Sequence, residues 1–304
     1  MSEARGAGGA TPFGEVRSVS NGSSGPLAFW RSTLRAVTTT LALLGGGKMG
    51  EALLGGLIDG GWDPESLAVA EVAAERRHAI EQRFTKIRVV PNPAWAVAEA
   101  EVVVVAVKPG DVAPALEAAE PILEPGALVL SIAAGVTISA LEALVPSRPV
   151  IRAMPNMPAV VGRGAAAIAA GSHAGDEHMA RAEGILSTVG TVVRVPEKLL
   201  DAVTGLSGSG PAYVFLVAEA LIEAGVHAGL PRPISQALVA QTLLGSATLL
   251  AQGPDGPEAL RAAVTSPGGT TAAGVAALEA RAVRAAFLEA VAAATVRSRA
   301  LGES

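Results

Sequence analysis

The segment Leu41-Ala42-Leu43-Leu44-Gly45-Gly46-Gly47-Lys48-Met49-Gly50 decides the fold of this chain. Four apolar residues suited to a buried strand run into glycines spaced as G-x-G-x-x-G, and a helical pattern follows over residues 49–60. In this arrangement the first glycine makes a tight turn, the second lets the backbone approach a pyrophosphate, and the third allows close helix–strand packing. The segment therefore predicts a dinucleotide-binding loop formed by Gly45, Gly47, Lys48, Met49 and Gly50.

Short apolar runs recur after this segment, separated by stretches with helical periodicity. The runs cover residues 41–44, 67–70, 87–90, 102–107, 128–130, 150–153, 165–169 and 192–195. Strands that alternate with helices of about ten to fifteen residues are typical of a parallel sheet covered on both faces. The run 102–107 is apolar at every position, as expected for a central strand. The sequence thus predicts an α/β fold whose first domain is a Rossmann-type, doubly wound parallel sheet.

The character of the chain changes near residue 205, after which the pattern is helical and punctuated by Gly-Pro and Pro-x-Pro breaks. Residues 1–38 are rich in Gly, Ser, Thr and Arg and lack apolar periodicity, which is typical of a disordered extension. We therefore expect an extension over residues 1–38, a dinucleotide-binding domain over 39–205 and an all-α domain over 206–304.

The choice between NAD and NADP stays open at the sequence level. Glu71 ends the second predicted strand, where a carboxylate can accept a hydrogen bond from the ribose 2′-hydroxyl of NAD. Lys48, Arg76 and Arg77 lie close by in the sequence and would attract the 2′-phosphate of NADP if they turn toward the adenosine end. Arginines on a helix are often only solvated, so the expected cofactor is NAD(H), NADP(H) or both.

Further turns follow predicted strands, and open α/β sheets bind ligands at the carboxyl ends of their strands. Two of them are Val107-Lys108-Pro109-Gly110 and Ala133-Ala134-Gly135. Asn156 follows another strand and is a candidate either for capping a local turn or for approaching a nicotinamide.

A second glycine-rich loop, Thr265-Ser266-Pro267-Gly268-Gly269-Thr270-Thr271, lies between two alanine-rich helical patterns. Proline stops the preceding helix, and glycines without a Cβ let backbone N–H groups approach a ligand. The start of the next helix offers free N–H donors and the positive end of its dipole, which suit a carboxylate or phosphate. The alternative interpretation is a tight turn between two helices.

Composition excludes several classes of function. The chain has 304 residues, a net charge of −5 and no cysteine. The negative charge and the lack of a basic stripe argue against nucleic acid or an anionic membrane as the main partner. Without cysteine there is no disulfide, thiolate nucleophile or cysteine-bound metal, and the composition suits a cytoplasmic protein. The four histidines are scattered, and we expect no metal site.

Residues 233–253 contain no charged side chain and are long enough to span a bilayer. Glutamine, serine and threonine nevertheless fall all round the expected helix, which hydrocarbon would penalise. We therefore expect this helix to be buried in a helical core or a subunit interface, and not in a membrane.

Taken together, the two loops and the strand-end turns make the chain resemble the pyrroline-5-carboxylate reductases, over about residues 39–299. The motifs that carry the resemblance are residues 44–50, 106–109, 133–138, 152–156, 201–213 and 266–271. The resemblance implies an NAD(P)H-dependent imine reduction that yields L-proline. It also implies an intertwined homodimer through the helical domain, often assembled into a decamer.

The resemblance assigns roles to individual residues. It implies that Ser266, Gly268, Gly269 and Thr270 bind the pyrroline carboxylate, and that Thr271 hydrogen-bonds the ring nitrogen. The residues implied to line the cofactor are Asn92, Ala106, Val107, Lys108, Pro109, Ala133, Ala134 and Gly135. Lys48 and Glu71 depart from the family pattern, in which asparagine or glutamine and a neutral residue are common at these positions.

Two alternatives remain at this level. A hydroxyacid dehydrogenase would share the domain order, but carbonyl reduction needs a proton donor, and the chain has no lysine after Lys198. A catalytically silent dinucleotide-sensing protein would have little use for an intact Ser266–Thr271 loop. Turnover with the imine discriminates between these alternatives and the reductase.

Overall fold

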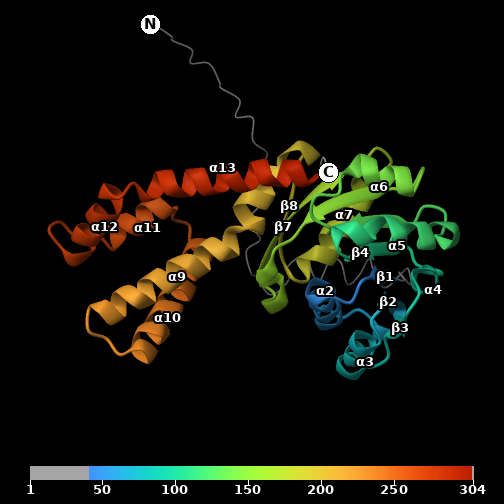
Figure 1. Cartoon of the computed structure of the whole chain (residues 1–304), viewed down its shortest axis with the longest axis horizontal. Coiled ribbons are helices and arrows are strands. Elements are labelled where there is room, and N and C mark those ends of the chain that lie inside the picture. The colour runs from blue at the N-terminus through green and yellow to red at the C-terminus, as the bar shows by residue number, and fades with distance from the viewer. Residues whose placement is uncertain (1–40, 303–304) are drawn as a thin grey trace, which may run out of the picture. The chain divides into compact units, whose positions relative to one another are not determined.

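The computed structural model describes residues 41–302, and the extension expected over residues 1–38 lies outside them. The described residues form an eight-stranded sheet in the order β3-β2-β1-β4-β5-β6-β7-β8 (Figure 1). The strands are β1 (Leu41–Leu44), β2 (Leu67–Ala70), β3 (Arg88–Val90), β4 (Val102–Val105), β5 (Leu128–Ser131), β6 (Val150–Met154), β7 (Gly164–Ala170) and β8 (Gly190–Arg194). Every predicted apolar run is therefore a strand.

One strand pair departs from the predicted parallel sheet. The six neighbouring strands from β3 to β6 in the sheet order, β1 and β2 included, are parallel. Strand β7 pairs with β6 in the antiparallel direction, with Ile151 opposite Ala170. The connection between them holds only one short helical turn, Met157–Val161. A parallel crossover needs about a dozen residues or more, so this connection is too short for one. Helix α7 then makes the crossover that returns β8 parallel to β7.

Helices cover both faces of the sheet (Figure 1). Leu41 and Leu43 of β1 belong to a core shared with α2 (Lys48–Asp59), α3 (Ala74–Arg83) and α7 (Asp176–Ser187). The alternate residues Ala42 and Leu44 pack with α4 (Pro93–Val97), α5 (Val112–Ala119) and α6 (Ile138–Leu144). Because side chains alternate along a strand, an uninterrupted apolar strand requires both layers.

The chain after β8 is helical. Its elements are α8 (Leu200–Val203), a π-helical turn (Thr204–Gly208), α9 (Gly210–His227), α10 (Arg232–Gln252), α11 (Pro257–Ala263), α12 (Thr270–Ala280) and α13 (Val283–Gly302). Helices α9 and α10 approach closely at Gly225, where a Cβ would lie 2.2 Å from the Ser235 hydroxyl oxygen. Helix α13 packs against the π-helical turn at Gly205, where a Cβ would lie 2.8 Å from the Val291 carbonyl oxygen.

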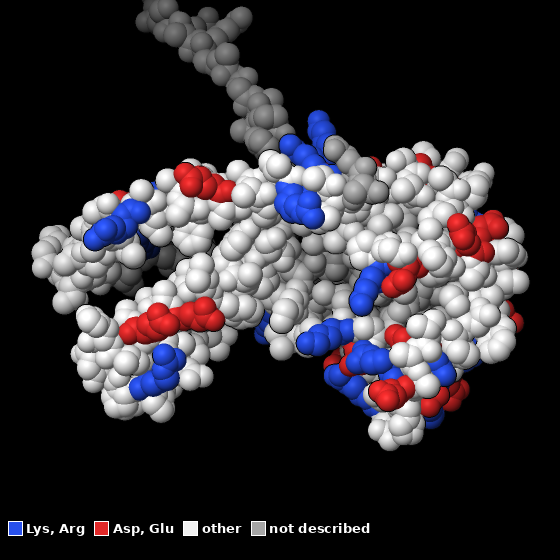
Figure 2. Space-filling view, viewed as in Figure 1, with Lys and Arg blue, Asp and Glu red and all other residues white. Residues whose placement is uncertain are grey.

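The C-terminal helices expose apolar side chains. Leu244 and Leu249 of α10 are 62% and 63% exposed, and Ser235 is the buried residue of this helix within the described chain. Of the two alternatives expected for residues 233–253, burial in a helical core of the same chain is therefore wrong, because α10 packs mainly on α9. Burial in a subunit interface stays a prediction. Figure 2 shows charged side chains of both signs around α3, whereas the surface of the C-terminal helices is mostly uncharged.

Two helical stretches of the described chain, Glu197–His227 and Arg232–Gln252, are long and apolar enough to cross a membrane. This is a test of length and composition alone, which a subunit interface of a soluble protein also satisfies.

Candidate active site

The glycine loop after β1 is shaped by contacts that leave no room for side chains. Gly45 has φ +106°, and a Cβ there would lie 2.8 Å from the carbonyl carbon of Ala106. A Cβ at Gly50 would lie 2.5 Å from the carbonyl oxygen of Gly45. The loop therefore needs glycine at both positions to pass β4 and to start α2.

Gly47 differs from these two glycines, because a Cβ there would meet no atom within 4 Å. It caps α2 in an extended conformation, and no side chain in the described chain accepts a hydrogen bond at this cap. Lys48 is exposed and Met49 is half-buried. The first amides of α2 thus face open space, and this cradle fits the pyrophosphate of a dinucleotide.

Glu71 lies at the carboxyl end of β2, beside the glycine loop. Its two carboxylate oxygens accept hydrogen bonds from the backbone N–H of Gly46 at 3.0 Å and of Ala73 at 2.9 Å. Arg76 forms an ion pair with Glu51 at 2.7 Å and donates a hydrogen bond to the Gly46 carbonyl. Arg77 donates to the carbonyls of Glu71 and Val72 at 3.0 and 2.7 Å. Both arginines are therefore held by acceptors of the protein.

The predicted strand-end turns converge on the same edge of the sheet. Strands β1, β4 and β5 are neighbours and parallel, so the glycine loop and the turns 106–109 and 133–135 follow one another along that edge. The Lys108 side chain is exposed, and Gly135 has φ +77°. The structure thus brings the candidate cofactor residues of three loops together.

Asn92 serves a local role. Its side-chain oxygen accepts a hydrogen bond from the Ala94 N–H at 2.9 Å and caps α4. Its implied contact with a cofactor stays a prediction.

Asn156 joins the sheet to the helical region. Its side-chain oxygen accepts from the Ala165 N–H at 2.8 Å, and its amide donates to the Ser207 carbonyl at 3.0 Å. Tyr213 donates its hydroxyl to the Gly205 carbonyl at 3.1 Å, in the same π-helical turn as Ser207. Both polar side chains therefore hold the connection between the two regions.

An ion pair between a buried arginine and a half-buried glutamate at this connection was not predicted from the sequence. Arg152 of β6, 7% exposed, pairs with Glu197 at 3.1 Å, and the same Glu197 oxygen accepts from the Ile138 N–H at 2.7 Å. A single charged residue within the apolar run 150–153 was the signal for it. The pair ties β6, the start of α6 and the entry to α8 together.

The second glycine-rich loop ends at an open helix N-terminus. Gly269 caps α12 in an extended conformation, and no side chain of the described residues caps it. The Gly269 N–H donates to the Ser266 carbonyl at 3.1 Å. A Cβ on Gly269 would lie 2.5 Å from the Ser266 hydroxyl oxygen, so this hydroxyl lies against the helix start. Gly268 has φ +71°, and Thr270 and Thr271 lie at the surface. The first N–H groups of α12, as at any helix start, have no acceptor within the helix itself.

The other end of α12 is fixed by charge. Glu279 lies 2.8 Å from Arg284 of α13 and 3.8 Å from Arg261 of α11. The hydrogen bond from Arg284 lowers the pKa of Glu279 and raises the pKa of Arg284. These contacts orient α12 and the loop before it.

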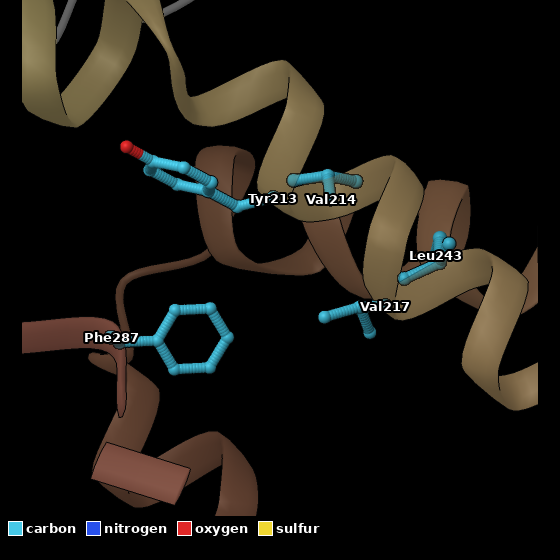
Figure 3. A pocket seen from close by; sticks show the side chains of 5 residues that line it. All are labelled: Tyr213, Val214, Val217, Leu243 and Phe287. Carbon is cyan, nitrogen blue, oxygen red and sulfur yellow. The ribbon is translucent and has the colours of Figure 1, made fainter. Parts of the chain in front are cut away.

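Two hollows lie along α9. One, of about 130 Å³, is lined by Tyr213, Val214, Val217, Leu243 and Phe287, and Figure 3 shows their side chains on facing helices. The other, of about 280 Å³, lies where α9 begins and includes Asn156 and Ser207 in its wall. The first hollow is apolar and open, which suits contact with another apolar surface.

The two predicted anion sites do not meet within one chain. Helix α12 packs against α13, and in Figure 1 it lies at the far end of the helical region from α2. The glycine loop after β1 and the Ser266–Thr271 loop of the same chain therefore lie apart.

Family models match both regions of the chain. Residues 197–301 match a model described as pyrroline-5-carboxylate reductase dimerisation, and residues 40–135 match one described as NADP oxidoreductase coenzyme F420-dependent. The chain is 46% identical to a pyrroline-5-carboxylate reductase of Synechocystis sp. over 86% of this chain and 98% of that protein. It is 39% identical to one of Arabidopsis thaliana over 87% and 96% of the two chains.

Solved structures agree with these matches. A pyrroline-5-carboxylate reductase of Coxiella burnetii superposes with a TM-score of 0.84 at 34% identity, over 88% of this chain and all of that one. The Plasmodium falciparum pyrroline carboxylate reductase, solved with NADP bound, gives a TM-score of 0.76 at 30% identity over 87% and 98% of the chains.

Proposed function

The chain belongs to the pyrroline-5-carboxylate reductase family, and we propose that its glycine loop and its Ser266–Thr271 loop are the two halves of one active site. The enzyme is an oxidoreductase that acts on a CH–NH group, reducing 1-pyrroline-5-carboxylate to L-proline with NAD(P)H. A hydroxyacid dehydrogenase and a silent dinucleotide-sensing protein are set aside with this assignment.

The observation that carries the site proposal is the uncapped N-terminus of α12 under the Ser266 hydroxyl. Backbone N–H groups at a helix start bind a carboxylate, and the helix dipole adds to their attraction. Ser266, Gly268, Gly269 and Thr270 hold the substrate carboxylate in this proposal. Thr271, one residue further along the exposed helix start, hydrogen-bonds the ring nitrogen.

The reaction depends mainly on how the protein positions the substrate. When bound, the dihydronicotinamide supplies a hydride to the imine carbon of the substrate, the atom that becomes C5 of proline. Protonated imine arriving from solution needs no general acid of the protein. The protein's own residues hold the carboxylate and the ring nitrogen next to it, which keeps the imine carbon on the other side of the nitrogen at a defined place.

Because the two loops of one chain lie apart, the α12 loop of one protomer faces the dinucleotide edge of its partner in this proposal. The apolar surface of α9, α10 and α13 forms the subunit contact, in keeping with the dimerisation model that matches this region. Domain bounds at 39–205 and 206–304 then separate the cofactor half from the substrate half. Association of dimers into a decamer and a cytoplasmic location without a membrane partner belong to the same proposal, supported by the family resemblance and the charge of −5.

Thr271→Ala tests the substrate half. Loss of one hydrogen bond to a charged group should lower kcat/KM for the imine by about ten- to a hundredfold. NADH affinity, measured by fluorescence titration, should stay within about twofold because the dinucleotide binds elsewhere. Thr271→Ser keeps the hydroxyl and should retain most of the activity.

Thr265→Ala is the matched control, since the Thr265 hydroxyl donates back to the Arg261 carbonyl of the preceding helix, α11, at 2.6 Å. It should leave kcat/KM nearly unchanged. Equal losses of imine turnover and NADH affinity in Thr271→Ala would mean that the loop is a structural turn, and the substrate assignment would be abandoned.

A further inference from the structure

We infer that this chain selects NADH over NADPH, and that Glu71 is the specificity-determining residue. The inference rests on the proposed placement of the dinucleotide at the glycine loop. At the adenosine end of the site, the sequence contains one carboxylate that would favour NADH and three cations that could favour NADPH.

Glu71 is fixed in place by the backbone around it. Its carboxylate receives the Gly46 N–H at 3.0 Å and the Ala73 N–H at 2.9 Å, so each oxygen already has one donor. An ionised carboxylate has about four acceptor positions, which leaves capacity for two further donors. The ribose hydroxyls of NADH are donors of this kind, and the end of β2 is where the fold presents them.

The carboxylate cannot swing away from an added phosphate without loss. A rotation would break both N–H contacts and leave the Gly46 amide, whose residue is buried, without its partner. Ile80, fully buried, occupies the neighbouring space, where a Cβ on Gly46 would lie 2.3 Å from the Ile80 Cδ1 atom. The negative charge therefore stays where a 2′-phosphate would have to lie.

The nearby arginines already have acceptors. Arg76 pairs with Glu51 at 2.7 Å, a carboxylate that Arg83 also contacts at 3.0 Å, and donates to the Gly46 carbonyl. Arg77 holds two carbonyls at the end of β2, at 3.0 and 2.7 Å. These contacts hold both guanidinium groups against the loop and the end of β2. Lys48 begins α2, on the pyrophosphate side of the loop.

The test is a binding measurement on the full-length protein. NADH and NADPH are titrated by fluorescence, and ADP-ribose and 2′-phospho-ADP-ribose are titrated by calorimetry, which removes the nicotinamide from the comparison. We expect NADH to bind at least about tenfold more tightly than NADPH, and ADP-ribose to bind at least about tenfold more tightly than 2′-phospho-ADP-ribose. The Glu71 carboxylate and the 2′-phosphate are like charges, which repel on this scale near a protein surface. Added salt screens this repulsion and should reduce the difference in affinity between each ligand and its 2′-phosphorylated form.

Glu71→Gln removes the charge and keeps an acceptor, and it should reduce the NADH-to-NADPH preference by about tenfold. Glu81→Gln, an exposed change of the same charge on α3, should leave the preference within about twofold. Equal or tighter binding of the 2′-phosphorylated ligands to the unmodified protein overturns the inference, as does an unchanged preference in a folded Glu71→Gln. Failure of both dinucleotides to bind would instead overturn the proposed placement of the cofactor.

Discussion

The sheet region and the C-terminal helices of this protein differ in how far their apolar side chains are exposed. In the sheet region, Leu43, Leu53 and Leu130 are fully buried between strands and helices of the same chain. In the helical region, Leu216, Leu244 and Leu288 are 65%, 62% and 74% exposed. The sheet region thus completes its core alone, whereas the helical region leaves a large apolar surface exposed, which suits the proposed subunit contact.

Breaking the helical contact should have the largest effect. Leu238 and Leu249 lie eleven residues apart on one face of α10 and are 55% and 63% exposed. The double change Leu238→Asp with Leu249→Asp should dissociate the dimer and lower kcat/KM by about a hundredfold or more, since the two halves of the site no longer meet. Light scattering and steady-state turnover measure the two effects.

NADH affinity of that variant should stay within about threefold, because the glycine loop lies wholly in the sheet region. Ile122→Asp, which changes a 46% exposed residue of the sheet region, is the control and should leave both dimer and turnover intact. A monomeric variant with full turnover would show that one chain holds a complete site.

The glycine loop allows a sharper separation of folding from binding within the sheet region. Gly50→Ala places a Cβ 2.5 Å from the Gly45 carbonyl oxygen and should cost about 1–3 kcal/mol of stability. Gly47→Ala meets no atom within 4 Å and should leave the melting temperature unchanged. It should still weaken NADH binding by about tenfold, because the methyl group enters the space of the pyrophosphate. Unchanged NADH affinity in Gly47→Ala would place the pyrophosphate elsewhere.

Substitution of Asn156, compared with substitution of Asn92, tests how strongly the sheet region and the C-terminal helices are joined. Asn156→Ala removes contacts to Ala165 and Ser207 and should cost about 1–3 kcal/mol in urea unfolding, since both partners lose a hydrogen bond. Asn92→Ala removes a single helix cap within the sheet region and should cost about 1 kcal/mol. A smaller loss for Asn156→Ala than for Asn92→Ala would mean that the connection does not depend on this side chain.

The smallest expected effect is at Glu142, on the surface of the sheet region. Hydrogen bonds from the Ser172 N–H and hydroxyl lower the pKa of Glu142 below its usual 4.5. A carboxyl with a lowered folded-state pKa stabilises the fold above about pH 4.5, and the contribution disappears as the pH falls through the folded value. Melting temperatures of Glu142→Gln and the unmodified protein should therefore differ slightly at pH 6 and converge near pH 3. A constant difference across this range would assign the effect to packing.

The strands and the glycine loop could be predicted from the sequence because their signals are local. An apolar run such as 102–107 has few structures that bury both of its faces. The antiparallel β7 was missed because strand direction depends on whether the connection can reach back across the sheet, and the residues of β7 themselves carry no sign of it. The Arg152–Glu197 pair was missed because its members lie 45 residues apart.

The same distinction between local sequence signals and long-range contacts applies to the candidate site. Amino-acid types and spacing by themselves determined the cofactor fold and the family, because glycines, prolines and hydroxyl side chains restrict the backbone locally. They also predict that the Ser266–Thr271 loop binds an anion. Only the tertiary structure decided that Glu71 is held by two amides, that Arg76 and Arg77 are already engaged, and that α10 is exposed within its own chain. These outcomes depend on which groups meet in space, and contacts such as Gly46 with Glu71 and Arg76 with Glu51 join residues 25 positions apart, beyond the reach of a local sequence pattern.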